Sequence, residues 1–237
     1  TSANWNFRES GSCFDIEDNI FSGETLPIEL SRGCVFKCKF CSFPLLGRKP
    51  DDKYLKEEDC IFNEMMHNYE HFGTTNYLMM CDTFNESTHK LLNINSAMNR
   101  FKRETGESMR YGAYVRLDLL ERFPEQIEIM GEMGVKASHF GIESLHYPSA
   151  KSVGKGLKTE KIYKTLEKCR DTWPSDAIMY SGFIIGLPHE TKETATEWCN
   201  ILLNRQIPLT CWKLAPYELL PRLGTKTLVM NGLRNFG

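Results

Sequence analysis

The 237-residue sequence lacks the features that would direct it to a membrane or to nucleic acid. No apolar run approaches the roughly 20 residues that a membrane-spanning helix needs, and the first residues do not follow the pattern of a secretory signal peptide. Positive charge is not in excess, because 29 Lys and Arg residues face 31 Asp and Glu residues, for a formal net charge of −2. There is therefore no overall basic field to attract nucleic acid. We expect a cytoplasmic protein that contacts neither a membrane nor nucleic acid.

The sequence also lacks a second cysteine-dense segment. Of its nine cysteines, six are scattered along the chain: Cys13, Cys60, Cys81, Cys169, Cys199 and Cys211. Without a secretion signal, these are expected to be reduced thiols rather than members of a disulfide framework.

The remaining three cysteines lie within eight residues, as Cys34, Cys38 and Cys41 in a C-x3-C-x2-C pattern, with Phe40 directly before the last. Three thiolates in one short loop can hold three irons of a [4Fe–4S] cluster, which leaves the fourth iron open to an outside ligand. A zinc site is the simpler alternative. Structural zinc sites, however, are closed by four ligands, and no second ligand pair with suitable spacing follows. The sequence therefore favours a cluster that acts on a bound molecule.

From Leu26 onward, short apolar runs alternate with longer amphipathic stretches. The expected strands are 26–31, 76–80, 110–115, 136–142, 177–185 and 208–214. The expected helices are 54–72, a stretch with Leu91, Ile94, Met98 and Phe101 on one face, one with Pro124 in its first turn, one that opens at Thr159, and 191–204. Gly73 and Gly106 suit helix ends, and Asp118 suits a cap. Strands that alternate with helices indicate an α/β fold with a parallel sheet.

Six such strands joined by right-handed crossovers can curl into a partial (β/α)6 barrel. On this basis we divide the chain into a lead-in segment at 1–25, a core domain at 26–214 and a C-terminal extension at 215–237.

Polar residues and glycines follow the expected strands, where ligands bind in parallel α/β folds. They are Asp82 and Thr83 after the second strand, Arg116 after the third, Glu143 and Ser144 after the fourth, and Gly182, Ile184 and Gly186 on and after the fifth. A zwitterionic, ribose-bearing ligand would require such a set. For Asp82 the alternative is a loop-initiating role. Arg116 could instead form a salt bridge with Asp118 or Glu121. The lysines from Lys151 to Lys168 are expected to form a solvated face, with contact between Lys155 or Lys158 and an anionic substrate as the alternative.

The stretch from Leu26 to Cys41, LPIELSRGCVFKCKFC, resembles the radical SAM superfamily, and most of all its branch associated with cobalamin-binding domains. The resemblance implies the partial (β/α)6 barrel of that family, with the open iron bound to the amino and carboxylate groups of S-adenosylmethionine (SAM). Cys34, Cys38 and Cys41 would then be both the metal ligands and the catalytic centre. Phe40 would lend its backbone to the adenine edge, although a packing role is equally allowed.

The later motifs of that branch match this sequence more loosely. Asp82 and Thr83 resemble the segment that holds the SAM amino group, with Cys81 in place of its first aspartate. The G-I-E-S segment carries Glu143 and Ser144, and its Glu would contact ribose or methionine. The stretch Gly182 to Gly186 resembles the G-x-I-x-G motif that packs Ile184 against adenine. Leu223-Gly224-Thr225 resembles a late P-G-T element.

The implied activity is reductive cleavage of SAM to a 5′-deoxyadenosyl radical, which abstracts hydrogen from a small-molecule or peptide substrate that the sequence does not identify. An electron donor such as a flavodoxin or ferredoxin would be needed. Methylation, rearrangement and other tailoring all remain open as outcomes. Cobalamin is a possible further cofactor, although no D-x-H-x-x-G motif is present in these residues. The alternative classes are an iron–sulfur electron-transfer or sensing protein, which would use four cysteines, and a paralogue that binds SAM without cleaving it.

Overall fold

The computed structural model describes residues 7–11, 14–41 and 54–217. Six strands form one sheet in the order β1-β2-β3-β4-β5-β6, and every neighbouring pair is parallel. The strands are β1 (Leu26–Glu29), β2 (Asn76–Met80), β3 (Arg110–Val115), β4 (Val135–Glu143), β5 (Ile178–Ile185) and β6 (Cys211–Pro216). The expected α/β partial barrel is confirmed, and within the described residues the sheet does not close.

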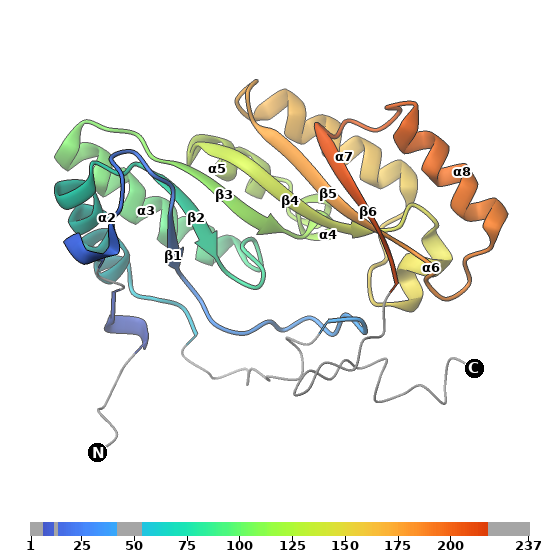
Figure 1. Cartoon of the computed structure of the whole chain (residues 1–237), viewed down its shortest axis with the longest axis horizontal. Helices are drawn as coiled ribbons and strands as arrows, with labels where there is room; N and C mark the ends of the chain where they lie inside the picture. Colours follow the sequence, from blue (N-terminus) through green and yellow to red (C-terminus); the bar gives the residue numbers. More distant parts are fainter. Residues whose placement is uncertain (1–6, 12–13, 42–53, 218–237) are drawn as a thin grey trace, which may run out of the picture.

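Helices connect the strands and line one face of the curved sheet (Figure 1). They are α2 (Glu58–Phe72), α3 (Thr88–Thr105), α4 (Leu117–Arg122), α5 (Glu125–Glu132), α6 (Tyr147–Ser152), α7 (Thr159–Thr172) and α8 (Lys192–Leu203), preceded by 3-10 turns η1 (Phe7–Glu9) and η2 (Ile16–Asp18). The chain that leaves β1 passes beneath the sheet toward α6 and the end of β6 (Figure 1). None of the helices described is long and apolar enough to cross a bilayer.

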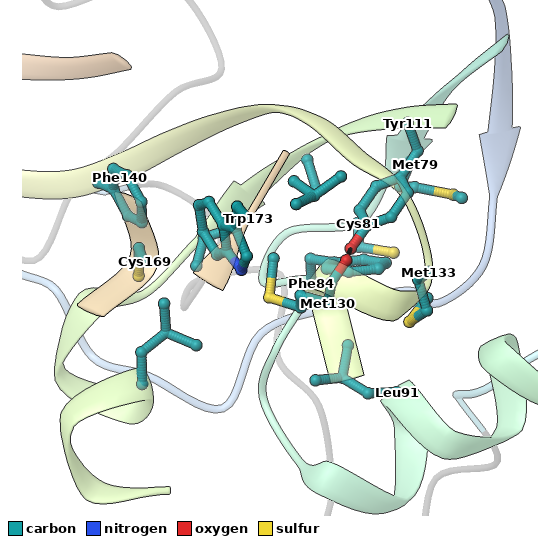
Figure 2. Close-up of a cluster of buried hydrophobic side chains, with 14 of the residues drawn as sticks. Met79, Cys81, Phe84, Leu91, Tyr111, Met130, Met133, Phe140, Cys169 and Trp173 are labelled. Carbon is teal, nitrogen blue, oxygen red and sulfur yellow. Dashed lines mark hydrogen bonds between the residues drawn. The ribbon is translucent and has the colours of Figure 1, made fainter. Parts of the chain in front are cut away.

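The core lies between the sheet and its helices, because alternate strand residues point to that face. Tyr111 on β3 packs near Met79 on β2, and its ring centroid lies 5.1 Å from that of Phe84 (Figure 2). Farther along the sheet, Phe140 on β4 stacks on Trp173 with the centroids 5.8 Å apart. Each of these side chains is at most 4% exposed. Because these side chains point toward the helices, the residues between them on each strand point toward the other face of the sheet.

Most expected element boundaries agree with the structure to within a few residues. Gly73 and Gly106 both adopt left-handed conformations at the ends of α2 and α3, as the sequence predicts. Strand β6 begins three residues later than expected, at Cys211, because Thr210 meets β5 partly through its side chain: its hydroxyl accepts a 3.0 Å hydrogen bond from the Met179 amide.

Three local expectations are wrong. Asp118 does not cap α4. The residue at the cap position is Arg116, which makes no side-chain capping bond, and the Asp118 carboxylate binds the Arg116 guanidinium instead. Pro124 lies at the cap position of α5 rather than inside its first turn. The short helix α6 was not expected, because its sequence YPSAKS has too few residues to show a helical period.

The proposed segment boundaries stay predictions. In the lead-in segment, Phe14 and Ile20 pack against the core. Most of the expected C-terminal extension, including Leu223-Gly224-Thr225, lies outside the described residues.

Two glycines with similar backbone angles give a matched test of packing at the turn before β4. Gly134 has φ +83° and a Cβ there would lie 2.5 Å from the Met109 carbonyl oxygen, whereas Gly106 has φ +77° and nothing within 4 Å. We expect Gly106→Ala to lower the free energy of unfolding by about 1 kcal/mol through backbone strain alone. Gly134→Ala should cost roughly 3 kcal/mol, because the clash adds to the strain. Urea unfolding of the reduced apoprotein measures both, and equal losses would contradict the packing account.

Candidate functional site

A cleft of about 440 Å³ opens on the inner side of the sheet, at the carboxyl ends of the strands. Most of the sequence-predicted site residues line it together: Cys34, Cys38, Phe40, Cys41, Asp82, Thr83, Arg116, Glu143, Gly182 and Ile184. Lys155, which the sequence offered as a contact for an anionic substrate, also lines the cleft. The cleft further contains residues that the sequence did not single out: Tyr114, Val115, His139, Gly141, Tyr180, Phe183, Lys213 and Ala215. Ser144 and Gly186 are not among the lining residues.

All three cysteines of the loop face this cleft. Cys38 is 7% exposed, and Cys34 and Cys41 are half-buried. The Cys34 thiol lies 3.4 Å from the Thr83 hydroxyl, and an Arg116 N–H donates to the Cys38 sulfur at 3.2 Å. N–H and O–H partners of this kind stabilise thiolate charge. Three thiols on one loop, at a cleft wall with such partners, fit the donor set of an iron–sulfur cluster.

A binding site for a single metal ion would need its ligands closer together than the three cysteines of this loop. Among the residues that the structure describes, no group of three or more His, Cys, Asp or Glu side chains is close enough to hold a single metal ion. A [4Fe–4S] cluster places each ligand sulfur on a separate iron, so its cysteines need a wider spacing than the ligands of one ion.

The turn after α6 holds the cysteine loop in place. The Val153 carbonyl accepts a 3.0 Å hydrogen bond from the Lys39 amide. Gly154 has φ +87°, and a Cβ there would lie 3.1 Å from the Lys37 carbonyl oxygen and 3.3 Å from the Cys38 Cα. Only glycine combines this backbone angle with so close an approach. The backbone of the loop is therefore packed against the backbone of this turn.

Arg116 is buried, and the N–H donors of its guanidinium already have partners. Its Nε and Nη2 donate to the two carboxylate oxygens of Asp118 at 3.0 and 2.6 Å, and its guanidinium lies 3.9 Å from the centre of the Phe36 ring. The salt bridge weighed as the alternative is therefore what the structure contains. With Asp118 occupying two donors and Cys38 a third, this arrangement does not present a free bidentate fork to a ligand carboxylate.

The segment with Asp82 and Thr83 is positioned by polar side chains that the sequence did not reveal. Lys90, with no exposed surface, donates to the Ser31 hydroxyl at 2.7 Å and to the Thr83 carbonyl at 2.8 Å. Asn85 donates to the Arg116 carbonyl at 3.0 Å. Burial raises the pKa of Asp82, against the opposing effects of the Gly33 amide and of Lys90.

Glu143 ends β4 in a left-handed conformation, with φ 68°. Lys155 reaches back over the strand, where its ammonium donates to the Gly141 carbonyl at 3.0 Å and lies 3.5 Å from a Glu143 carboxylate oxygen. Burial raises the pKa of Glu143, and Lys155 opposes this rise. The Ser144 hydroxyl accepts from the His146 amide instead of entering the cleft.

Gly141 and Gly182 are register partners on β4 and β5, so bare backbone lines the middle of the cleft wall. Ile184 lies farther along β5, on the same lining. Gly186 turns away at φ +87°, and its amide donates to the Glu190 carboxylate at 2.6 Å. Because Gly141 and Gly182 have no side chains, a ligand has room to approach the backbone here.

A double-mutant cycle tests whether Gly141 leaves space for Lys155. A Cβ at Gly141 would lie 2.5 Å from the Lys155 ammonium. Lys155→Ala should lower the free energy of unfolding by about 1–2 kcal/mol, because Glu143 and the Gly141 carbonyl lose a buried donor. Gly141→Ala should cost a similar amount by displacing the ammonium, yet add almost nothing in the Lys155→Ala background. Urea unfolding should thus show a coupling of about 1 kcal/mol or more, and additive losses would contradict this contact.

Comparisons with known proteins agree with this geometry. The family model described as "Radical SAM superfamily" matches residues 28–201. The chain is 27% identical over 183 residues to a hopanoid C-2 methylase of Rhodopseudomonas palustris and 25% identical over 193 residues to a bacteriochlorophyllide d C-12(1)-methyltransferase of Chlorobaculum tepidum. These alignments cover 77% and 81% of this chain but only 34% and 40% of the relatives.

Solved structures show the same fold. The radical SAM methyltransferase TsrM from Kitasatospora setae, solved with cobalamin and a [4Fe–4S] cluster, superposes with a TM-score of 0.63 at 17% identity, over 81% of this chain and 37% of that one. The cobalamin-dependent radical enzyme OxsB, with aqua-cobalamin and SAM bound, gives 0.60 at 16% identity, over 90% and 30%. With a family model that spans the end of β1, the cysteine loop and strands β2 to β5, the chain belongs to the radical SAM superfamily and is an enzyme of that type.

Proposed function

We propose that Cys34, Cys38 and Cys41 hold the [4Fe–4S] cluster that this family uses and that the cleft beside them binds SAM. The observation that carries the proposal is the convergence of the three thiols, the Asp82–Thr83 segment and the bare backbone of Gly182 on one cleft. When bound, the cluster and SAM together supply a 5′-deoxyadenosyl radical for hydrogen abstraction from a substrate. The protein binds, orients and shields these groups.

Arg116, Asp82 and Glu143 would have different roles in this site. Arg116 donates to the Cys38 sulfur and is fixed by Asp118, so it orients a cluster ligand rather than the SAM carboxylate. Asp82 and Glu143 would accept hydrogen bonds from the SAM ammonium and the ribose hydroxyls. Burial disfavours the charged form of both carboxyl groups, and a cationic ligand nearby would offset that cost. Both positions therefore suit a ligand that carries positive charge.

Ile184 and the backbone around Phe40 lie where they could pack against adenine. Ser144 and Gly186 would act indirectly, through the backbone at the ends of β4 and β5.

We further propose that methyl transfer is the reaction of the whole protein. The supporting observations are the names of the relatives, which are methylases, and the cobalamin in the two solved structures. The chain spans about a third of the length of those relatives. Rearrangement or other tailoring of the substrate is the alternative outcome. An electron donor such as a flavodoxin or ferredoxin would reduce the cluster, and a reducing cytoplasm would suit both the cluster and the free thiols.

Anaerobic reconstitution with iron and sulfide tests the central proposal. The reduced protein with SAM should release 5′-deoxyadenosine, and Cys38→Ala should lower this release by at least about a hundredfold, equivalent to roughly 2.7 kcal/mol in the barrier. Cys199→Ala, which removes a half-buried thiol on α8, is the matched control and should retain the activity.

Iron analysis and the electron paramagnetic resonance spectrum of the cluster complete the measurement. A cluster that forms but neither binds nor cleaves SAM would support the electron-transfer or sensing class. Zinc in place of iron would overturn the radical reaction altogether.

A further inference from the structure

Three aromatic rings form a row across the inner face of the sheet, within the lining of the cleft. Tyr114 on β3 is the register partner of His139 on β4, which is the partner of Tyr180 on β5. The ring centroids lie 5.2 Å apart for the first pair and 4.6 Å for the second. Each ring precedes another cleft-lining residue by two positions in the sequence, namely Arg116, Gly141 and Gly182, which places the row about 6–7 Å deeper into the cleft.

The row stays open to the cleft because its neighbours are small. Tyr114 is 47% exposed, which is unusual for a ring on a central strand. A Cβ at Gly182 would lie 3.4 Å from the His139 Nε2, so the glycine leaves the edge of the imidazole uncovered. All three rings line the cleft. On the adjoining strand, Met80 is 42% exposed and continues this surface with an apolar side chain.

The charge on this surface is asymmetric. Burial, and secondly the charge of Lys155, lowers the pKa of His139, which favours the neutral form of its ring. Lys155 and Arg116 in the same lining are paired with Glu143 and Asp118, whereas Lys213 on β6 is exposed, lines the cleft and is the register partner of Gly182. None of the ion pairs between described residues includes Lys213. The surface thus runs from apolar at β2, through neutral rings, to a cation at β6.

We propose that Tyr114, His139 and Tyr180 form an aromatic floor that binds a planar, unsaturated ring of the substrate, while Lys213 binds an anionic group on the same molecule. Offset stacking on neutral rings favours a flat π-system, and the Lys213 ammonium, which has no carboxylate partner among the described residues, favours a carboxylate or phosphate. This assignment of a substrate class rests on the proposed function, because the floor is part of the lining of the cleft that would hold SAM.

Indole-3-acetate is a suitable probe, since it combines a planar ring with a carboxylate, and indole-3-acetamide is its neutral counterpart. Each probe is titrated into the reconstituted protein without reductant, and binding is monitored by saturation-transfer NMR. Both probes should bind, and the Kd of the acid should be about fivefold lower than that of the amide. Tyr114→Ala and Tyr180→Ala should each weaken both probes by about fivefold. Lys213→Met should abolish the preference for the acid while the amide still binds.

Phe21→Ala and Lys192→Met are the matched controls, because they remove an exposed ring and an exposed cation elsewhere, and they should change nothing. If the probes do not bind, or if they bind the two tyrosine variants as tightly as the unaltered protein, the proposed aromatic floor is wrong. An unchanged preference in Lys213→Met would overturn the anion site.

The release of 5′-deoxyadenosine by the unaltered protein is measured separately. If the probes bind but SAM is not cleaved, the proposed function fails while the ring site stands, and its role as a substrate floor is lost. If SAM is cleaved but the probes do not bind, only the substrate class is overturned.

Discussion

The packing of the cysteine loop against the turn after α6 is the contact on which the rest of the site depends. The Val153 carbonyl binds the loop amide of Lys39, and Gly154 allows the two backbones to touch near Cys38. The next residue, Lys155, reaches in the opposite direction to Gly141 and Glu143 at the end of β4. Three consecutive residues thus set the position of the thiols and of a cleft carboxylate together. A shift in this turn would move both halves of the site at once.

Much of the architecture could be predicted from the sequence, because parallel βαβ units carry a strong pattern and place their strand ends at one edge. The rule that polar residues after successive strands converge found Asp82, Thr83 and Glu143, which line the same cleft as the cysteines. It could not find the aromatic row, because Tyr114, His139 and Tyr180 lie within their strands, where they look like ordinary strand residues. Nor could it assign Lys155 to a partner, since the gap that admits its ammonium exists only because Gly141 lies opposite.

Two lysines are buried at a considerable desolvation cost, and each has an anionic partner. Lys90 lies 3.7 Å from a Glu86 carboxylate oxygen and also donates to Ser31 after β1 and to Thr83 after β2, and Lys56 forms a 2.7 Å ion pair with the buried Glu64. Removing one partner of such a pair leaves an uncompensated charge, which is far more costly than the pair is stabilising. The arrangement therefore favours one position for the loop between β2 and α3 over alternatives. Arg116 fits the same pattern, because its guanidinium donates to Asp118 and Cys38 of the protein itself.

The partners of the cysteine loop are remote in sequence, and this has a consequence for how the protein matures. Cys34 touches Thr83, 49 residues away, and Cys38 touches Arg116, 78 residues away. The turn that supports Lys39 comes still later in the chain, at Val153. On a ribosome the three thiols therefore emerge long before the surfaces that hold them. In the proposed cluster site, iron and sulfide could therefore be received in the final geometry only after β4 and α6 have been synthesised and folded.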